Sequence, residues 1–244
     1  MSLHSLKMLL RRTGFDVRRT RNVPALTFLG LGKIPVQCVL DVGANLGQFA
    51  RYAREHFAAS HIHCFEPLPG PAAQIRDWGA GAGAGAGRVS VYELALGDAP
   101  GEAELIEHLD HSPSSSFLKS TERSDQMFPQ TVRQTTRRVR VDTLDNWAAA
   151  HEALLLRPCL LKLDVQGFEM QVLRGAARTL ARVDLCLVEV TPIPLYEGQA
   201  TFVEIVGALA AAGLHYLGNL EQYHDQAGVP VYMDALFVRP ALLG

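Results

Sequence analysis

Short apolar runs alternate with amphipathic stretches over most of this 244-residue chain. A short apolar run is typical of a strand buried on both faces, and apolar positions three or four residues apart are typical of a helix. The predicted strands cover residues 37–41, 61–66, 89–94, 159–164 and 185–190. The predicted helices cover residues 47–57, 71–78, 168–181 and 202–212. This alternation predicts parallel strands joined by right-handed crossovers, with helices on both faces of the sheet.

The end of the chain follows a different pattern. Residues 213–217 and 232–238 are two apolar runs with no helical pattern between them. Two strands joined by a loop pair antiparallel. The sequence therefore predicts an α/β fold in which a mostly parallel, Rossmann-like sheet of seven strands is closed by a C-terminal antiparallel hairpin.

Two segments interrupt the alternation. Residues 79–87 alternate glycine and alanine, a composition typical of a pliable linker. Residues 108–137 are long and polar, and a loop of this length in a compact domain is often a functional lid. Because this segment follows the third predicted strand, we expect it to cover a ligand.

Composition describes an ordinary globular protein. Hydrophobic residues make up 48% and charged residues 20% of the chain, and the net charge of −2 does not favour binding to bulk nucleic acid. The four cysteines are widely spaced within apolar runs, which predicts buried, reduced thiols and a cytoplasmic location. No apolar run has the length of a membrane span. The oligomeric state cannot be predicted from these features.

The first residues are basic and interrupted by leucines. Leu3, Leu6 and Leu10 share one helical face, so residues 1–35 are interpreted as a basic helix with a connector, and residues 36–244 as the main domain. Such a helix can contact anionic lipid or an acidic substrate. More often it packs its leucines on its own domain, and that interpretation is favoured here.

The run Asp41-Val42-Gly43-Ala44-Asn45-Leu46-Gly47 joins the first predicted strand to its helix. Gly43 and Gly47 would let the backbone approach a ligand, and Asn45 tolerates a positive φ. The dinucleotide fingerprint needs glycine where this chain has Asn45 and Gln48, so the match to a nicotinamide site is poor.

Two acidic residues favour a nucleoside with a charged tail over a nicotinamide dinucleotide as the ligand. Asp41 suits a ligand that carries an amino group and a sulfonium, as S-adenosylmethionine does. Glu66 ends the second predicted strand, where a carboxylate can accept hydrogen bonds from both ribose hydroxyls. The alternative is that Asp41 is only a strand-end acid beside a tight turn.

A further set of charged residues lies at the end of the fourth predicted strand and at the start of the next helix. Lys162 and Asp164 share one face of this strand, and Glu169 falls in the first turn of the next helix. We expect Asp164 to act as the general base of a transfer to a hydroxyl, with Lys162 and Glu169 setting its charge and orientation. The alternative is a structural ion pair of Lys162 with Asp164 or with Glu169.

A divalent metal at the same edge is a weaker interpretation. Asp164 and Glu189 could supply oxygen ligands. The histidine pairs 61/63 and 108/111 are more typical of core or surface positions than of metal ligands. The sequence favours a site without an obligatory metal.

Together the motifs resemble the FkbM family of S-adenosylmethionine-dependent methyltransferases. The resemblance depends on the turn at 41–47, Phe65-Glu66-Pro67, Ala95-Leu96-Gly97-Asp98, the stretches 141–145, 172–176 and 188–190, and above all the K-x-D-x-x-G-x-E block from Lys162 to Glu169. It implies a class I methyltransferase fold, S-adenosylmethionine as cofactor, and methylation of a hydroxyl on a small molecule, sugar, glycolipid or polyketide.

The expected cofactor residues follow from these motifs. Asp98 would meet the adenine amino group, and Ser115 or Ser116 would line the lid side. The full set is Asp41, Gly43, Ala44, Asn45, Gly47, Gln48, Glu66, Pro67, Asp98 and Ser116. The remaining alternatives are a nicotinamide-dependent oxidoreductase and an inactive scaffold that only binds the cofactor.

Overall fold

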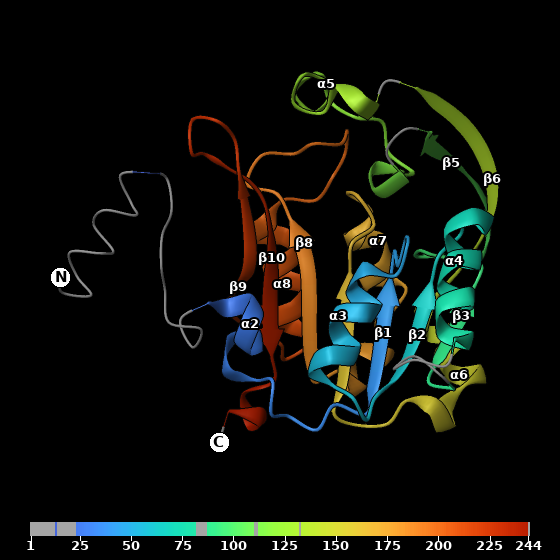
Figure 1. Ribbon diagram of the computed structural model, residues 1–244, viewed down its shortest axis with the longest axis vertical. Helices are drawn as coiled ribbons and strands as arrows, with labels where there is room; N and C mark the ends of the chain where they lie inside the picture. Colours follow the sequence, from blue (N-terminus) through green and yellow to red (C-terminus); the bar gives the residue numbers. More distant parts are fainter. Residues whose placement is uncertain (1–12, 14–22, 82–86, 110–111, 132, 244) are drawn as a thin grey trace.

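The computed structural model describes residues 13, 23–81, 87–109, 112–131 and 133–243. Its centre is a seven-stranded sheet with the order β3-β2-β1-β7-β8-β10-β9 (Figure 1). Every neighbouring pair is parallel except the two that involve β10, which are antiparallel. The predicted mostly parallel sheet with a C-terminal hairpin is therefore confirmed.

The elements of this central layer follow the sequence pattern closely. The strands are β1 (Cys38–Val42), β2 (His61–Phe65), β3 (Val89–Tyr92), β7 (Cys159–Leu163), β8 (Leu185–Val190), β9 (His215–His224) and β10 (Pro230–Val238). The helices are α2 (Pro24–Thr27), α3 (Gln48–His56), α4 (Pro69–Ala80), α6 (Leu144–Ala150), α7 (Glu169–Arg174) and α8 (Phe202–Ala211). Short 3-10 turns are η2 (Phe28–Gly30), η5 (Glu152–Leu154), η6 (Thr179–Arg182) and η7 (Pro240–Leu242).

Two apolar cores lie on opposite faces of the sheet. Because successive side chains of a strand point to opposite faces, each strand contributes to both cores. On one face, α3, α4 and η2 cover residues such as Val39 and Leu160. On the other, α6, α7 and α8 cover residues such as Leu40 and Leu161. Figure 1 shows α3 in front of the sheet and α8 behind it.

A second, smaller sheet extends beyond the carboxyl ends of the central strands (Figure 1). It consists of β4 (Ala95–Leu96), β5 (Gly101–His108) and β6 (Gln134–Asp142) in the order β4-β6-β5. Between β5 and β6 the chain forms η3 (Ser112–Ser114), α5 (Glu122–Met127) and η4 (Pro129–Thr131). The prediction of one long loop over residues 108–137 was therefore wrong. Most residues of β6 are exposed and polar, and β5 mixes glutamates with apolar residues, so neither strand is a continuous apolar run.

The predicted helix over residues 168–181 was also too long. Its regular part, α7, ends at Arg174, and the chain then reaches η6 through turns. Gly175 lies so close to the backbone of Gly97 that a Cβ there would be 1.9 Å from the carbonyl oxygen. Glycine is therefore required at position 175, where the helix ends, because the two backbones touch. The short helix α6 was not predicted.

The N-terminal region is described from Val23 onward, apart from Thr13. Phe28 and Leu31, which precede residue 35, are buried in the same core as α3. The boundary between an N-terminal region and the main domain at residue 35 stays a prediction. The expected basic helix, and residues 82–86 of the glycine/alanine run, lie outside the described residues. The four cysteines are buried free thiols, as predicted. Across the described ranges, no helix combines the length and apolarity needed to cross a bilayer.

Candidate active site

The turn after β1 is held by a contact between two backbones. Gly43 has a φ of +75°, and a Cβ at this position would be 1.9 Å from the carbonyl oxygen of Asp164. Asn45 adopts the expected positive φ, at 44°. Glycine is therefore required at position 43 because the turns after β1 and β7 touch, and not only because a ligand passes nearby.

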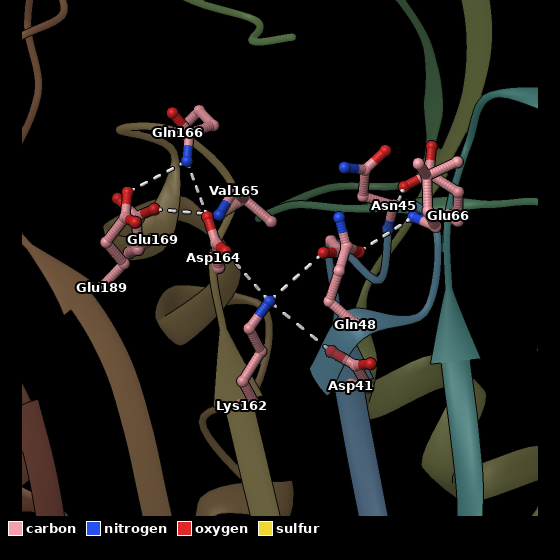
Figure 2. Close-up of polar contacts among 12 residues, drawn as sticks. Asp41, Asn45, Gln48, Glu66, Lys162, Asp164, Val165, Gln166, Glu169 and Glu189 are labelled. Atoms are coloured by element: carbon pink, nitrogen blue, oxygen red, sulfur yellow. Dashed lines mark hydrogen bonds and ion pairs between the residues drawn. The ribbon is translucent and has the colours of Figure 1, made fainter. Parts of the chain in front are cut away.

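Glu66, just after β2, fastens this turn from the side. Its Oε2 accepts a hydrogen bond of 2.8 Å from the amide of Asn45, and its Oε1 accepts one of 2.9 Å from the amide of Leu68 (Figure 2). Burial raises the pKa of Glu66 to about 7, although both hydrogen bonds act in the opposite direction. Since a carboxylate offers about four acceptor positions, about two remain for a ligand.

A narrow cavity lies beside Glu66. It contains about 60 Å³ of space, and its walls are mainly apolar. The segment between β5 and α5 closes it through Pro113, Ser115 and Phe117. The other lining residues are Val42, Gly43, Asn45, Phe65, Glu66, Pro67, Leu68, Leu94, Ala95, Leu96, Leu105, Asp164, Val165 and Gln166. This segment therefore lies where a lid was predicted.

Lys162 is the central charge of the site. Its Nζ lies 3.1 Å from Oδ2 of Asp164, 3.6 Å from Oδ1 of Asp41 and 3.3 Å from the carbonyl oxygen of Gly43 (Figure 2). Burial lowers the pKa of Lys162, but the two carboxylates outweigh this effect and raise it. Lys162 is therefore a buried cation that links the turn after β1 to the end of β7.

Asp41 lies beneath Lys162 and not in a cavity. It is 0% exposed, and within the described residues neither of its carboxyl oxygens has a hydrogen-bond partner. Burial raises its pKa, while Lys162 lowers it. Asp41 lines neither cavity, so its expected direct contact with a ligand is not supported, and it is connected to the site through Lys162.

Glu169 fixes the turn after β7, which fits its expected role of orienting Asp164. Its Oε1 accepts hydrogen bonds from the amides of Val165, at 3.0 Å, and Gly167, at 3.2 Å. It is 4% exposed, and burial raises its pKa to about 7. The structure shows no pair between Lys162 and Glu169 but does show the pair with Asp164. Glu169 holds the turn that presents Asp164.

Gln166 occupies that turn and joins two carboxylates. Its Nε2 donates to Oδ1 of Asp164 at 2.7 Å and to Oε1 of Glu189 at 2.9 Å (Figure 2). Its Oε1 accepts from the hydroxyl of Tyr196 at 2.7 Å, and its backbone φ is 54°. An amide thus lies between the two carboxylates that were considered as metal ligands. Within the described ranges, no cluster of three or more potential ligands suits a metal.

A wider cavity of about 440 Å³ lies on the other side of Asp164. Its size is within the usual range for ligand sites. The helix α3 forms one wall, and the β9–β10 hairpin forms another. The lining residues are Gly43, Ala44, Asn45, Gln48, Phe49, Tyr52, Pro113, Lys162, Asp164, Leu187, Leu220, Glu221, Tyr232 and Asp234. Gly43, Asn45, Pro113 and Asp164 line both cavities, which are therefore neighbouring parts of one crevice.

Several predicted residues do meet in this crevice. They are Gly43, Ala44, Asn45, Gln48, Glu66, Pro67, Lys162 and Asp164. Gly47 shapes the turn, with a φ of +78°, but lines neither cavity. Asp98 is exposed at the end of β4 and also lines neither cavity, so its expected adenine contact is not supported.

Ser116 is buried beneath the lid instead of lining it. Its hydroxyl donates to the carbonyl oxygen of Gln166 at 2.6 Å and accepts from the amide of Leu118 at 3.0 Å. Ser115 lines the narrow cavity. Ser116 therefore connects the closing segment to the turn after β7.

The histidine pairs pack as ordinary side chains. His61 stacks on His63 with ring centroids 4.6 Å apart, and His63 also contacts Trp147. Burial, with smaller effects from His61 and His151, lowers the pKa of His63 to about 3. His108 contacts the carbonyl oxygen of Thr131, and position 111 lies outside the described residues.

The acidic end of the wide cavity was missed from the sequence. Asp234, Glu221 and Tyr232 all come from the C-terminal hairpin. The only signal was a charged residue, Asp234, inside an otherwise apolar strand. A polar residue in such a run marks a position facing something other than the core.

The model of the FkbM methyltransferase domain matches residues 41–216, which include the turn after β1, Glu66 and the whole β7 block. The chain belongs to the FkbM methyltransferase family. It is 30% identical over 185 residues to the 2-O-methyltransferase NoeI of Sinorhizobium fredii, an alignment that covers 72% of each chain. It is also 30% identical over 183 residues to the antimetabolite synthetase AmbE of Pseudomonas aeruginosa, covering 64% of this chain and 8% of AmbE.

A solved FkbM methyltransferase from Methylobacillus flagellatus KT has a similar fold. The superposition has a TM-score of 0.52 at 11% identity, and it covers 91% of this chain and 48% of that one. At this identity the likeness concerns the fold alone. This chain is thus a class I methyltransferase of the FkbM family, and it spans about half the length of that solved structure.

Proposed function

We propose that this FkbM chain is an S-adenosylmethionine-dependent O-methyltransferase that acts on a hydroxyl of a sugar or another polyhydroxylated small molecule. The observation that carries the proposal is the two-part crevice, with a carboxylate at its narrow end and a buried cation beside carboxylates at its wide end. NoeI is described as a 2-O-methyltransferase, which supports transfer to oxygen.

The residues of the crevice fit the cofactor. Glu66 has acceptor positions left for a ribose diol. Apolar side chains such as Leu68 and Leu96 line the same narrow part and suit a purine base. Lys162 offers a positive charge to the carboxylate of the amino-acid end, and Asp164 offers a negative charge to its amino group.

S-adenosylmethionine supplies a methyl group that is already activated by its bond to a positive sulfur. The protein must mainly align the acceptor oxygen with that group and receive a proton. The wide cavity has room for the acceptor, and its aromatic side chains, Phe49 and Tyr232, can contact the apolar face of a sugar ring. We also propose that the protein is cytoplasmic, because its four cysteines are buried free thiols, which are typical of a reducing compartment.

Calorimetry and a transfer assay test this function. We expect S-adenosylmethionine to bind with a micromolar Kd and NAD not to bind, because Asn45 and Gln48 line the crevice where the dinucleotide fingerprint needs glycine. We further expect radiolabelled methyl transfer to at least one member of a panel of methyl glycosides and polyols. Binding of NAD without binding of S-adenosylmethionine would contradict the cofactor, and absence of transfer would contradict the O-methylation.

A further inference from the structure

The acid Asp234 lies opposite a β-bulge of the C-terminal hairpin, at the wall of the wide cavity. The register of β10 with β9 runs from Met233 opposite Gln222 to Ala235 opposite Asn219. Leu220 and Glu221 therefore lie opposite the single residue Asp234, and all three line the wide cavity. Bulges often reorient a side chain next to an active site.

Asp234 lies on the same face of the sheet as the charges of β7. It is paired in register with Glu189 of β8, and directly paired residues of antiparallel strands point to one face. Leu236, two residues along β10, belongs to the core on the α3 side, as does Leu160 of β7. Lys162, Asp164 and Asp234 accordingly line one cavity beneath α3.

The side chains of Asp164 and Asp234 differ in their hydrogen bonds and ion pairs within the protein. One oxygen of Asp164 is 3.1 Å from the ammonium of Lys162, and the other accepts from Gln166 at 2.7 Å. By contrast, the carboxylate of Asp234 forms no hydrogen bond or ion pair with any other residue that the structure describes. Both oxygens of Asp234 are therefore available to a ligand in the cavity.

The surroundings of Asp234 also favour proton uptake. Burial, and next the negative charge of Asp164, raise its pKa to about 6, against the effect of Lys162. A general base works best when its pKa lies near the working pH. The titratable groups that face it are Lys162 and Asp164 from β7, Glu189 from β8, Glu221 from β9, Tyr232 from β10 and Tyr52 from α3.

We propose that Asp234 is the catalytic carboxylate that takes the proton of the acceptor hydroxyl, while Asp164 has a binding role. This inference rests on the proposed O-methylation. The O–H bond of the acceptor breaks and its proton passes to a carboxylate oxygen of Asp234. The electron pair of the acceptor oxygen forms the new O–CH₃ bond, and the pair of the broken S–CH₃ bond stays on the departing thioether. The protonated Asp234 then releases its proton to solvent.

The variant Asp234→Asn tests this assignment against Asp77→Asn, a control at an exposed carboxylate of α4 outside both cavities. We expect Asp234→Asn to keep its Tm and its Kd for S-adenosylmethionine but to lose at least about 100-fold in kcat, the usual contribution of a general base. The acidic limb of the pH–rate profile, near pH 6, should disappear in Asp234→Asn. In Asp164→Asn it should persist but shift to lower pH, because the negative charge that helps to raise the pKa of Asp234 is gone.

Two further measurements separate proton transfer from a structural role. Formate should restore part of the activity of Asp234→Ala, because a small carboxylate can replace the missing base. In protein labelled with ¹³C at aspartate carboxyls, one resonance should titrate near pH 6 and be absent from Asp234→Asn, without any acceptor present. Absence of that titration would overturn the assignment.

The other outcomes are equally decisive. If the unaltered chain is active and Asp234→Asn has the same kcat and pH profile, Asp234 is not the base. That result would leave the proposed O-methylation intact. A Kd for S-adenosylmethionine raised more than about tenfold would make Asp234 a cofactor ligand instead, since a tenfold change corresponds to about 1.4 kcal/mol. No transfer by the unaltered chain to any acceptor of the panel would contradict the proposed O-methylation itself.

Discussion

The two ends of the crevice are formed by different elements and lined by different kinds of side chain. The narrow end comes from the turn after β1, the end of β2 and the small sheet, and its walls are mainly apolar around one carboxylate, Glu66. The wide end comes from α3, β7 and the β9–β10 hairpin, and it carries Asp164, Glu221 and Asp234 against the single cation Lys162. This difference suits a nucleoside at the narrow end and a polar acceptor without negative charge at the wide end.

Lys162 contacts Gly43 and Asp164, which line both ends of the crevice, and its removal should have the largest effect. Lys162→Met leaves Asp41, which is 0% exposed, without its only ion-pair partner among the described residues. Breaking a buried pair in this way costs about 3–5 kcal/mol of unfolding free energy. Urea denaturation should show this loss, while Lys33→Met, at an exposed position, should lose less than about 0.5 kcal/mol.

The double variant Asp41→Asn/Lys162→Met sharpens that test. Because it removes the stranded charge together with the cation, it should recover more than half of the stability lost in Lys162→Met. If the double variant is as unstable as the single one, the loss comes from packing and not from the buried carboxylate.

Glu66→Gln should separate the two ends of the crevice. Hydrogen bonds to a charged group contribute about 1.5–3 kcal/mol, so its Kd for S-adenosylmethionine should rise by roughly 10- to 100-fold. Glu93→Gln, at an exposed residue paired with Arg76, should not change it. Calorimetry measures both, and equal affinities in Glu66→Gln and the unaltered chain would remove Glu66 from the cofactor site.

The pKa of Glu66 adds a pH dependence to that comparison. Since burial raises this pKa to about 7, the carboxylate becomes protonated as the pH falls below 7 and loses acceptor capacity. Cofactor affinity of the unaltered chain should therefore be lower at pH 6 than at pH 8. In Glu66→Gln the same change of pH should have little effect, and a parallel decrease in both proteins would assign it to another group.

Glu169→Gln should change stability without disturbing the turn, because an amide oxygen can still accept from Val165 and Gly167. Burial raises the pKa of Glu169 in the folded protein to about 7, above its ordinary value of 4.5, so folding favours the protonated form. The free energy of unfolding contributed by Glu169 therefore decreases as the pH rises from about 4.5 to 7.

The variant removes that decrease. At pH 8 it should be more stable than the unaltered chain by on the order of 2 kcal/mol, and at pH 4 the two should be equal. Urea denaturation at both pH values measures this difference. Glu169→Ala, which leaves both amides without an acceptor, should instead be less stable at every pH. A Glu169→Gln variant that is destabilised at pH 8 would contradict the proposed burial cost.

The sequence was most informative where a site is made by neighbours along the chain. The turn at 41–47, Glu66 and Lys162–Asp164 were predicted because strand ends and glycines have a local pattern, and the structure brings most of these residues into one crevice. The parallel sheet and its terminal hairpin were predicted for the same reason. Periodicity is a property of a single segment.

The rest depends on contacts between distant segments. Asp98 follows the third strand as predicted, but the chain turns there into a second sheet, in which Val139 and Val141 of β6 alternate with arginines and no continuous apolar run marks a strand. Asp41 has the position of a strand-end acid in the sequence, but the side chain that lies beside it, Lys162, comes from a strand more than a hundred residues away. Asp234 becomes part of the site because β10 pairs with β8, which lies next to β7, and strand order and register cannot be predicted from one strand alone.

The smallest expected effect concerns the closing segment of the narrow end. That cavity contains about 60 Å³, so a nucleoside needs the segment that carries Pro113, Ser115 and Phe117 to move outward. Ser116 ties this segment to Gln166 by a hydrogen bond of 2.6 Å. Ser116→Ala should lose about 1 kcal/mol of unfolding free energy, as is typical for one hydrogen bond.

The same variant should exchange the cofactor faster. If the segment must open before S-adenosylmethionine enters or leaves, a weaker tether raises the association and dissociation rates together, by severalfold each, and leaves Kd nearly unchanged. Stopped-flow binding measures both rates, with Thr135→Ala at an exposed residue of β6 as the control. A change in dissociation alone would mean that Ser116 stabilises the bound state, and unchanged rates would mean that opening occurs elsewhere along the crevice.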